Sequence, residues 1–215
     1  MSSSVLQVVG SRGLPGFLCT PPEASALVVF AHGSGSSRFS VRNREVAQAL
    51  NRAGMATLLF DLLRPDEEAE EGRAKVFDIA FLAERLVDVV RWADVAFSDH
   101  VMPIGLFGAS TGAGAALVAA AELGDRISAV VSRGGRPDLA GRALTNVRAP
   151  TLLIVGGNDH PVLELNRNAL DQLRGLASLE IIPGATHLFE EPGAMEQVTA
   201  LATDWFERYL TATPT

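Results

Sequence analysis

The chain has one cysteine among its 215 residues, Cys19, so no internal disulfide can form, which fits a reducing compartment. Lysine and arginine number 18 against 25 aspartates and glutamates, and a net charge of −7 leaves no basic excess to neutralise nucleic-acid phosphates. No apolar run approaches the roughly 20 residues of a membrane span, and residues 1–4 lack the basic and apolar segments of a secretory signal. We therefore expect a soluble cytoplasmic protein that binds neither nucleic acid nor membranes.

Signatures of metal and cofactor chemistry are also missing. The sequence has no cluster of cysteine and histidine with zinc-ligand spacing and no phosphate-binding G-x-x-x-x-G-K loop. Gly108, Gly112 and Gly114 have the spacing of a dinucleotide-binding turn, but they lie halfway along the chain, whereas that turn belongs at the first strand. The matching dehydrogenases also need a tyrosine and a lysine four residues apart, and the sole tyrosine, Tyr209, has no such partner. We expect no cofactor and no metal.

What the sequence does contain is an alternation of strand-like and helix-like segments. Residues 5–9 and 17–20 flank the turn-rich segment 10–16 and predict an antiparallel hairpin. Apolar runs predict buried strands at 26–31, 56–60, 101–107, 127–132, 151–155 and 179–182. Helices are predicted at 44–53, 77–96, 113–123, 163–173 and 194–209, and a polar surface loop at 64–75. This order predicts an α/β fold, a doubly wound and mostly parallel sheet, in a single domain over residues 1–215.

A serine occupies the turn between one of these strands and the helix that follows. Ser110 lies in Gly108-Ala109-Ser110-Thr111-Gly112, a G-x-S-x-G pattern that forces the serine into a strained turn and exposes its hydroxyl. A serine hydroxyl is a poor nucleophile, so it needs a base, usually a histidine oriented by a buried carboxylate. Ser110 is therefore the candidate nucleophile.

Partners for Ser110 are expected at the carboxyl ends of later strands. Asp159 and His187 each follow a predicted strand, and the chain order Ser, Asp, His is that of α/β-hydrolases. We interpret Asp159 as the orienting acid and His187 as the base. Other residues compete for these roles, namely Asp138 and Glu164 for the acid and His32, His100 and His160 for the base.

An oxyanion formed during acyl transfer needs two hydrogen-bond donors. The backbone N–H of Thr111, which follows the nucleophile and opens a helix, is one candidate. The second is the N–H of Ser34 in the glycine-rich loop after strand 26–31, with the N–H of Gly35 as the alternative.

Charged residues near these strand ends suggest how a substrate is held. Arg38 and Arg133 are candidates to bind a substrate carboxylate through a bidentate pair, and His32 is a further substrate-binding candidate. Salt bridges to local acids are the alternative role for the arginines. Arg42, Arg44 and Arg136 share the same region, and Asp61 and Asp138 are the nearby acids.

These features together resemble the α/β-hydrolase superfamily, most closely the dienelactone hydrolase family. The resemblance rests on Leu14-Pro15-Gly16-Phe17, Ala31-His32-Gly33-Ser34-Gly35, the serine turn, Gly156-Gly157-Asn158-Asp159 and Ala185-Thr186-His187. It implies an α/β-hydrolase fold with no inserted cap domain. Dienelactone hydrolases carry cysteine as the nucleophile, whereas this chain has Ser110, which is typical of a general carboxylesterase.

The function that we expect is hydrolysis of small carboxylic esters or lactones through an acyl-enzyme, with an anionic substrate as a hypothesis. A thioesterase, peptidase or acyltransferase would use the same three residues, and a non-catalytic ligand-binding protein of this fold is the alternative from another class. The sequence does not indicate the oligomeric state.

Overall fold

The computed structural model describes residues 4–64, 66, 67 and 74–211, and within them eight strands form one sheet in the order β1-β2-β4-β3-β5-β6-β7-β8. The strands are β1 (Val5–Val9), β2 (Leu14–Cys19), β3 (Leu27–Ala31), β4 (Ala56–Phe60), β5 (Ile104–Ala109), β6 (Ile127–Arg133), β7 (Thr151–Gly156) and β8 (Ala177–Ile182). β2 pairs antiparallel with β1 and β4, and all other pairs are parallel. The predicted fold class, a mostly parallel sheet with an N-terminal antiparallel pair, is confirmed.

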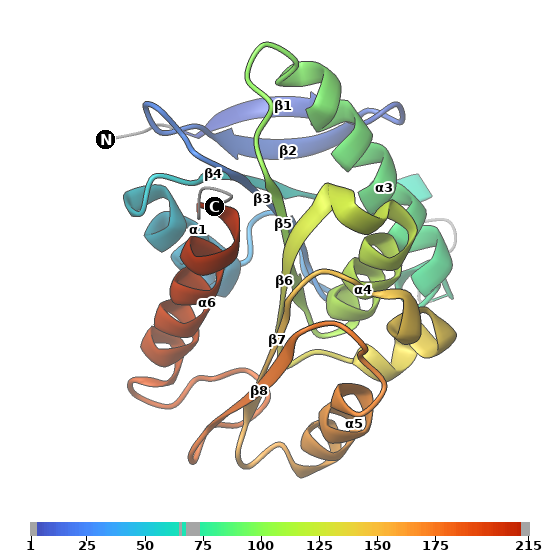
Figure 1. Ribbon diagram of the computed structural model, residues 1–215, viewed down its shortest axis with the longest axis vertical. Helices are drawn as coiled ribbons and strands as arrows, with labels where there is room; N and C mark the ends of the chain where they lie inside the picture. Colours follow the sequence, from blue (N-terminus) through green and yellow to red (C-terminus); the bar gives the residue numbers. More distant parts are fainter. Residues whose placement is uncertain (1–3, 65, 68–73, 212–215) are drawn as a thin grey trace.

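Helices cover both faces of this sheet (Figure 1). One face carries α1 (Val41–Arg52) and α6 (Ala194–Leu210), and the other carries α3 (Ile79–Ala96), α4 (Thr111–Leu123) and α5 (His160–Leu170). Short 3-10 segments, η1 (Gly124–Arg126) and η2 (Pro137–Asn146), follow α4 and β6. Every residue of β3, β4, β5 and β7 is buried, as expected for parallel strands covered on both faces. Within the described segments, no helix combines the length and the apolar character needed to cross a membrane.

Element boundaries differ from the sequence predictions where side chains cap a helix or where the local pattern is weak. Helix α1 begins at Val41 and not at residue 44, because Ser40 Oγ accepts the N–H of Asn43 and caps the helix. Strand β2 begins at Leu14 within the segment predicted to be a turn. Segment η2 was not predicted, and Gly141 breaks it with a φ of 50°. Of the predicted surface loop 64–75, residues 66, 67, 74 and 75 are helical, and residues 65 and 68–73 lie outside the described residues. Residues 1–3 also lie outside them.

The junction between β5 and α4 is packed so closely that its glycines cannot carry a side chain. A Cβ on Gly108 would lie 2.4 Å from the Cα of Ala113, and a Cβ on Gly112 would lie 2.3 Å from the carbonyl oxygen of Ala31. Both neighbours are backbone atoms, so neither can turn aside. The two glycines therefore hold the start of α4 against the ends of β5 and β3.

We expect Gly112→Ala to lower the free energy of unfolding by about 1–3 kcal/mol or more, since the added methyl overlaps backbone of β3. Gly157→Ala is the matched control, because a Cβ there would meet its nearest atom at 3.3 Å. Its effect should stay within about 1 kcal/mol. Urea denaturation of both variants measures the difference, and equal stability of the two would contradict the packing argument.

Candidate active site

Ser110 lies in a strained turn at the carboxyl end of β5. Its φ of 50° and ψ of −122° are rare for a residue with a side chain and cost about 1–3 kcal/mol. Hydrogen bonds hold this conformation: the N–H of Ser110 donates to the carbonyl of Arg133 (3.2 Å), and its own carbonyl accepts the N–H groups of Ala113 (3.1 Å) and Arg136 (3.0 Å). The turn geometry predicted for the serine is therefore present, and β6 helps to fix it.

Asp159 and His187 meet at the same edge of the sheet, after β7 and β8. The Nδ1 of His187 donates to Oδ2 of Asp159 at 2.7 Å, which leaves Nε2 of the ring as an acceptor. The carboxylate is 12% exposed and the imidazole 39% exposed. A largely buried acid thus fixes the tautomer of a histidine whose other side can reach a substrate.

Backbone contacts lock the two loops that carry this pair. The N–H of Asn158 donates to the carbonyl of Ala185 (2.9 Å), and a Cβ on Gly156 would lie 2.4 Å from that same oxygen. The competing acids have other partners, since Asp138 pairs with Arg136 and Glu164 with Arg167.

A carboxylate that the sequence analysis missed also supports the histidine loop. Glu191 accepts hydrogen bonds from the backbone N–H (3.0 Å) and the hydroxyl (2.7 Å) of Thr186, the residue before His187. The hydrogen bond from the Thr186 hydroxyl is the main cause that lowers the pKa of Glu191 below its usual value. A glutamate five residues after a threonine has no distinctive sequence pattern, so only the structure reveals this contact.

Gly134 lies between the serine turn and the histidine loop. A Cβ on Gly134 would be 3.1 Å from the carbonyl oxygen and 3.6 Å from Cε1 of His187. Among the described residues, no hydrogen bond joins Ser110 Oγ to His187. Such bonds are often long without substrate and shorten when it binds.

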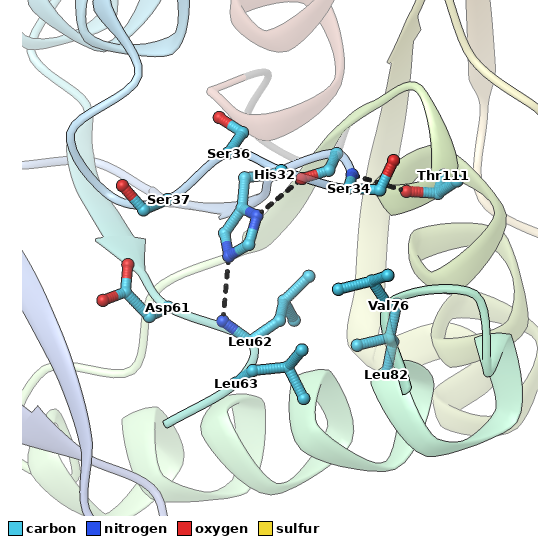
Figure 2. A pocket seen from close by; sticks show the side chains of 12 residues that line it. His32, Ser34, Ser36, Ser37, Asp61, Leu62, Leu63, Val76, Leu82 and Thr111 are labelled. Atoms are coloured by element: carbon cyan, nitrogen blue, oxygen red, sulfur yellow. Dashed lines mark hydrogen bonds between the residues drawn. The ribbon is translucent and has the colours of Figure 1, made fainter. Parts of the chain in front are cut away.

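Ser34 and Thr111, the two predicted oxyanion donors, lie against each other. The N–H of Ser34 donates to the side-chain Oγ1 of Thr111 at 2.9 Å (Figure 2). The loop carrying Ser34 also lies close to Ser110, because a Cβ on Gly33 would lie 3.0 Å from the Cβ of Ser110. Both residues thus lie beside Ser110, but the N–H of Ser34 already has a partner.

His32 connects this loop to the end of β4. Its Nε2 accepts the N–H of Leu62 (3.0 Å), and its Nδ1 donates to the carbonyl of Gly33 (2.9 Å). Both ring nitrogens are therefore bound to backbone, which leaves the ring carbons to contact a ligand.

A small pocket opens beside Ser34 and Thr111 (Figure 2). Its volume is about 50 Å³. One wall is polar, with His32, Ser34 and Thr111, and the other is apolar, with Leu62, Leu63 and Leu82. The pocket can accept a small group that is partly apolar and that lies next to the serine turn.

The arginines near this edge divide into paired and unpaired side chains. Arg38 forms an ion pair with Asp61, and Arg136 forms a two-point ion pair with Asp138 (2.8 and 2.7 Å). For both residues the structure therefore has the salt bridge that was the alternative to carboxylate binding.

Arg133 is different, because it is 7% exposed and has no carboxylate partner among the described residues. Its Nη2 is 3.5 Å from Oδ1 of Asn43, and its buried Nε has no partner. Burial, and secondarily the charge of Arg42, lowers the pKa of Arg133 to about 10. A lowered pKa of a base means that its charge opposes folding, and this penalty is fully present below about pH 10.

We therefore expect Arg133→Met to raise the free energy of unfolding at neutral pH by about 1–4 kcal/mol, since it replaces a buried charge that has no carboxylate partner with an apolar chain of similar length. Arg38→Met is the control with the opposite sign, because it leaves Asp61 without its cation. Thermal and urea denaturation measure both. If Arg133→Met destabilises as much as Arg38→Met, the buried guanidinium is compensated within the protein.

Within the described part of the chain, no group of three or more histidine, cysteine, aspartate or glutamate side chains could hold a metal ion. The arrangement at this edge is instead that of a serine, a histidine and a carboxylate beside a small pocket.

Comparison with known proteins gives the family. The model of the dienelactone hydrolase family matches residues 14–212. The crystal structure of a dienelactone hydrolase from Anabaena variabilis is 54% identical, covers 98% of each chain and superposes with a TM-score of 0.91. Est1E from Butyrivibrio proteoclasticus shares the fold at 20% identity, with a TM-score of 0.79 over 96% of this chain and 98% of its own.

A curated relative from Mycobacterium tuberculosis, named "Putative phosphoribosyl transferase", is 59% identical over 203 residues. The match covers 94% of this chain but only 45% of that protein, so the chain spans about half the length of this relative. On the family match and the fold, the chain belongs to the dienelactone hydrolase family and has the α/β-hydrolase fold.

Proposed function

We propose that the protein is a serine hydrolase that cleaves small carboxylic esters or lactones through an acyl-enzyme. The observation that carries this proposal is the Asp159–His187 hydrogen bond of 2.7 Å at the same sheet edge as the strained Ser110. Membership of a hydrolase family supports it. A strained, glycine-flanked serine beside an acid-oriented histidine has the features of an activated nucleophile.

In this mechanism Ser110 Oγ attacks the substrate carbonyl while His187 Nε2 takes its proton. The carbonyl electrons move to oxygen, and the Thr111 N–H at the start of α4 donates to the oxyanion that forms. His187 then gives its proton to the leaving alcohol as the C–O bond breaks. Water attacks the acyl-enzyme by the same route, and Asp159 stabilises the imidazolium in both steps.

The alternative suggested by the name of the mycobacterial relative is phosphoribosyl transfer. This chain spans 45% of that protein, and the hydrolase family covers nearly all of this chain. We therefore propose hydrolysis for this chain. Thioesters and amides would pass through the same acyl-enzyme, so the substrate class depends on the surroundings of Ser110.

We further propose that the substrate is anionic and that Arg133 binds its negative group. Arg133 is the last residue of β6, and its carbonyl accepts the N–H of Ser110, so the backbone of the arginine is anchored beside the nucleophile. A buried guanidinium without a carboxylate partner is costly to a protein, and a substrate carboxylate would supply the missing charge. Arg38 does not have this property, because it pairs with Asp61.

Ser110→Ala should lower kcat for p-nitrophenyl acetate by several orders of magnitude, since the three residues act as a unit. Circular dichroism should show an unchanged fold. A fluorophosphonate probe should label the wild type and not the variant. Labelling at neither protein would favour a non-catalytic binding protein, and residual activity near the wild-type value would refute the role of Ser110.

Arg133→Met should raise the KM of an anionic ester, the monosuccinate ester of p-nitrophenol, by about 10- to 100-fold, the value of one or two hydrogen bonds to a charged group. The neutral pentanoate ester of p-nitrophenol serves as the matched substrate, and its KM should change little. Steady-state kinetics with both esters make the comparison. An equal change for the two would contradict anion recognition.

A further inference from the structure

Thr111 carries a hydroxyl that the mechanism above does not use. The residue is 3% exposed and lines the pocket beside the serine turn. Its Oγ1 accepts the N–H of Ser34 at 2.9 Å, and among the described residues no acceptor receives its own hydrogen. A buried hydroxyl donor without a hydrogen-bond partner is unfavourable. The unpaired hydroxyl hydrogen therefore suggests that a ligand in the pocket supplies the acceptor.

The position of this hydroxyl relates it to the reacting atoms. Thr111 directly follows the nucleophile, and the loop that donates to it lies close to Ser110 at Gly33, whose ideal Cβ lies 3.0 Å from Ser110 Cβ and 3.7 Å from Ser110 Oγ. The hydroxyl therefore lies in the corner between the nucleophile turn and the loop after β3. When Ser110 attacks a substrate carbonyl, negative charge develops on the carbonyl oxygen, and donors beside the nucleophile can stabilise it.

The hydrogen bond from the N–H of Ser34 to Thr111 Oγ1 also affects whether that N–H can donate to an oxyanion. Because Thr111 Oγ1 accepts the N–H of Ser34, the hydroxyl hydrogen cannot point at that N–H and is directed elsewhere. Donation into the oxygen also polarises the O–H group and strengthens the bond that it can donate in turn. Ser34 would then act on the oxyanion through the hydroxyl and not directly.

We propose that the Thr111 hydroxyl is a catalytic donor to the oxyanion, oriented by the N–H of Ser34, so that one residue supplies both an N–H and an O–H to the same oxygen. This inference rests on the proposed serine mechanism. The hydroxyl donates a hydrogen bond and transfers no proton. The proton of Ser110 still passes to His187, and the carbonyl electrons still move to oxygen.

Thr111→Val keeps the β-branched shape and removes the hydroxyl, so kcat for p-nitrophenyl acetate should fall about 100- to 1,000-fold, the usual effect of losing one oxyanion donor. KM should change less than about threefold. The inhibition constant of phenylboronic acid, which forms a tetrahedral adduct with an active-site serine, should rise by a factor similar to the loss in kcat. Thr111→Ser keeps the hydroxyl and should lose far less kcat than Thr111→Val.

Thr111→Ala is the second variant, because it removes the hydroxyl without pressing a methyl group on the N–H of Ser34. It should show the same loss of kcat and of boronic acid affinity that is expected for Thr111→Val, and it tests the proposal even if the valine variant folds poorly.

An unchanged or higher kcat in Thr111→Ala would mean that Ser34 N–H is itself the donor, and would overturn the proposal. A loss of kcat with unchanged boronic acid affinity, or an equal loss in Thr111→Ser, would also overturn it. Failure of the serine mechanism itself is separate, because Ser110→Ala would then retain activity.

Discussion

The strained backbone of Ser110 is the constraint on which the rest of this edge depends. A φ of 50° at a serine is held by the neighbouring backbone: Gly112 packs against the end of β3, the carbonyl of Arg133 at the end of β6 accepts the N–H of Ser110, and the N–H of Arg136 donates to the carbonyl of Ser110. The same contacts hold the loop after β3 and the end of β6 against this turn. The positions of Ser34 and Arg133 therefore depend on the turn that carries the candidate nucleophile.

The acid and the histidine form a second unit, built separately from the serine turn. The loops after β7 and β8 contact each other through backbone at Gly156 and Ala185, and Asp159 binds His187 across them. The two units meet at Gly134, whose φ of 49° strains any residue with a side chain and whose added Cβ would lie 3.1 Å from the His187 carbonyl oxygen. Gly134 therefore lies between the turn of Ser110 and the loop of His187 and belongs to neither.

Much of the fold and of this site could be predicted from the sequence because the signals are local. Buried strands appear as apolar runs, and Asp159 and His187 follow such runs directly, so the topology of a parallel sheet brings them to one edge. The hydrogen-bond and salt-bridge partners of individual side chains have no such local pattern in the sequence. Nothing in the sequence distinguishes Arg133 from Arg38, although Arg38 pairs with an aspartate 23 residues away. Nor does the sequence indicate that the Thr111 side chain accepts the N–H of Ser34.

Two arginines in the described chain are almost fully buried, and their different surroundings bear on the substrate. Arg85 is 2% exposed and forms an ion pair with Glu67, whereas Arg133 has an amide oxygen at 3.5 Å and a second arginine nearby. In the sheet, β5 lies between β3 and β6, so the loop after β3 and the backbone of Arg133 are both next to the strand that ends at Ser110, while the guanidinium of Arg133 reaches Asn43 of α1. In the proposed complex, the corner formed by Thr111 and Ser34 binds the carbonyl oxygen of the ester, and Arg133 binds its anionic group. The substrate would then be oriented by two groups that lack a partner in the described protein: the hydroxyl hydrogen of Thr111, which has no acceptor, and the guanidinium of Arg133, which has no carboxylate.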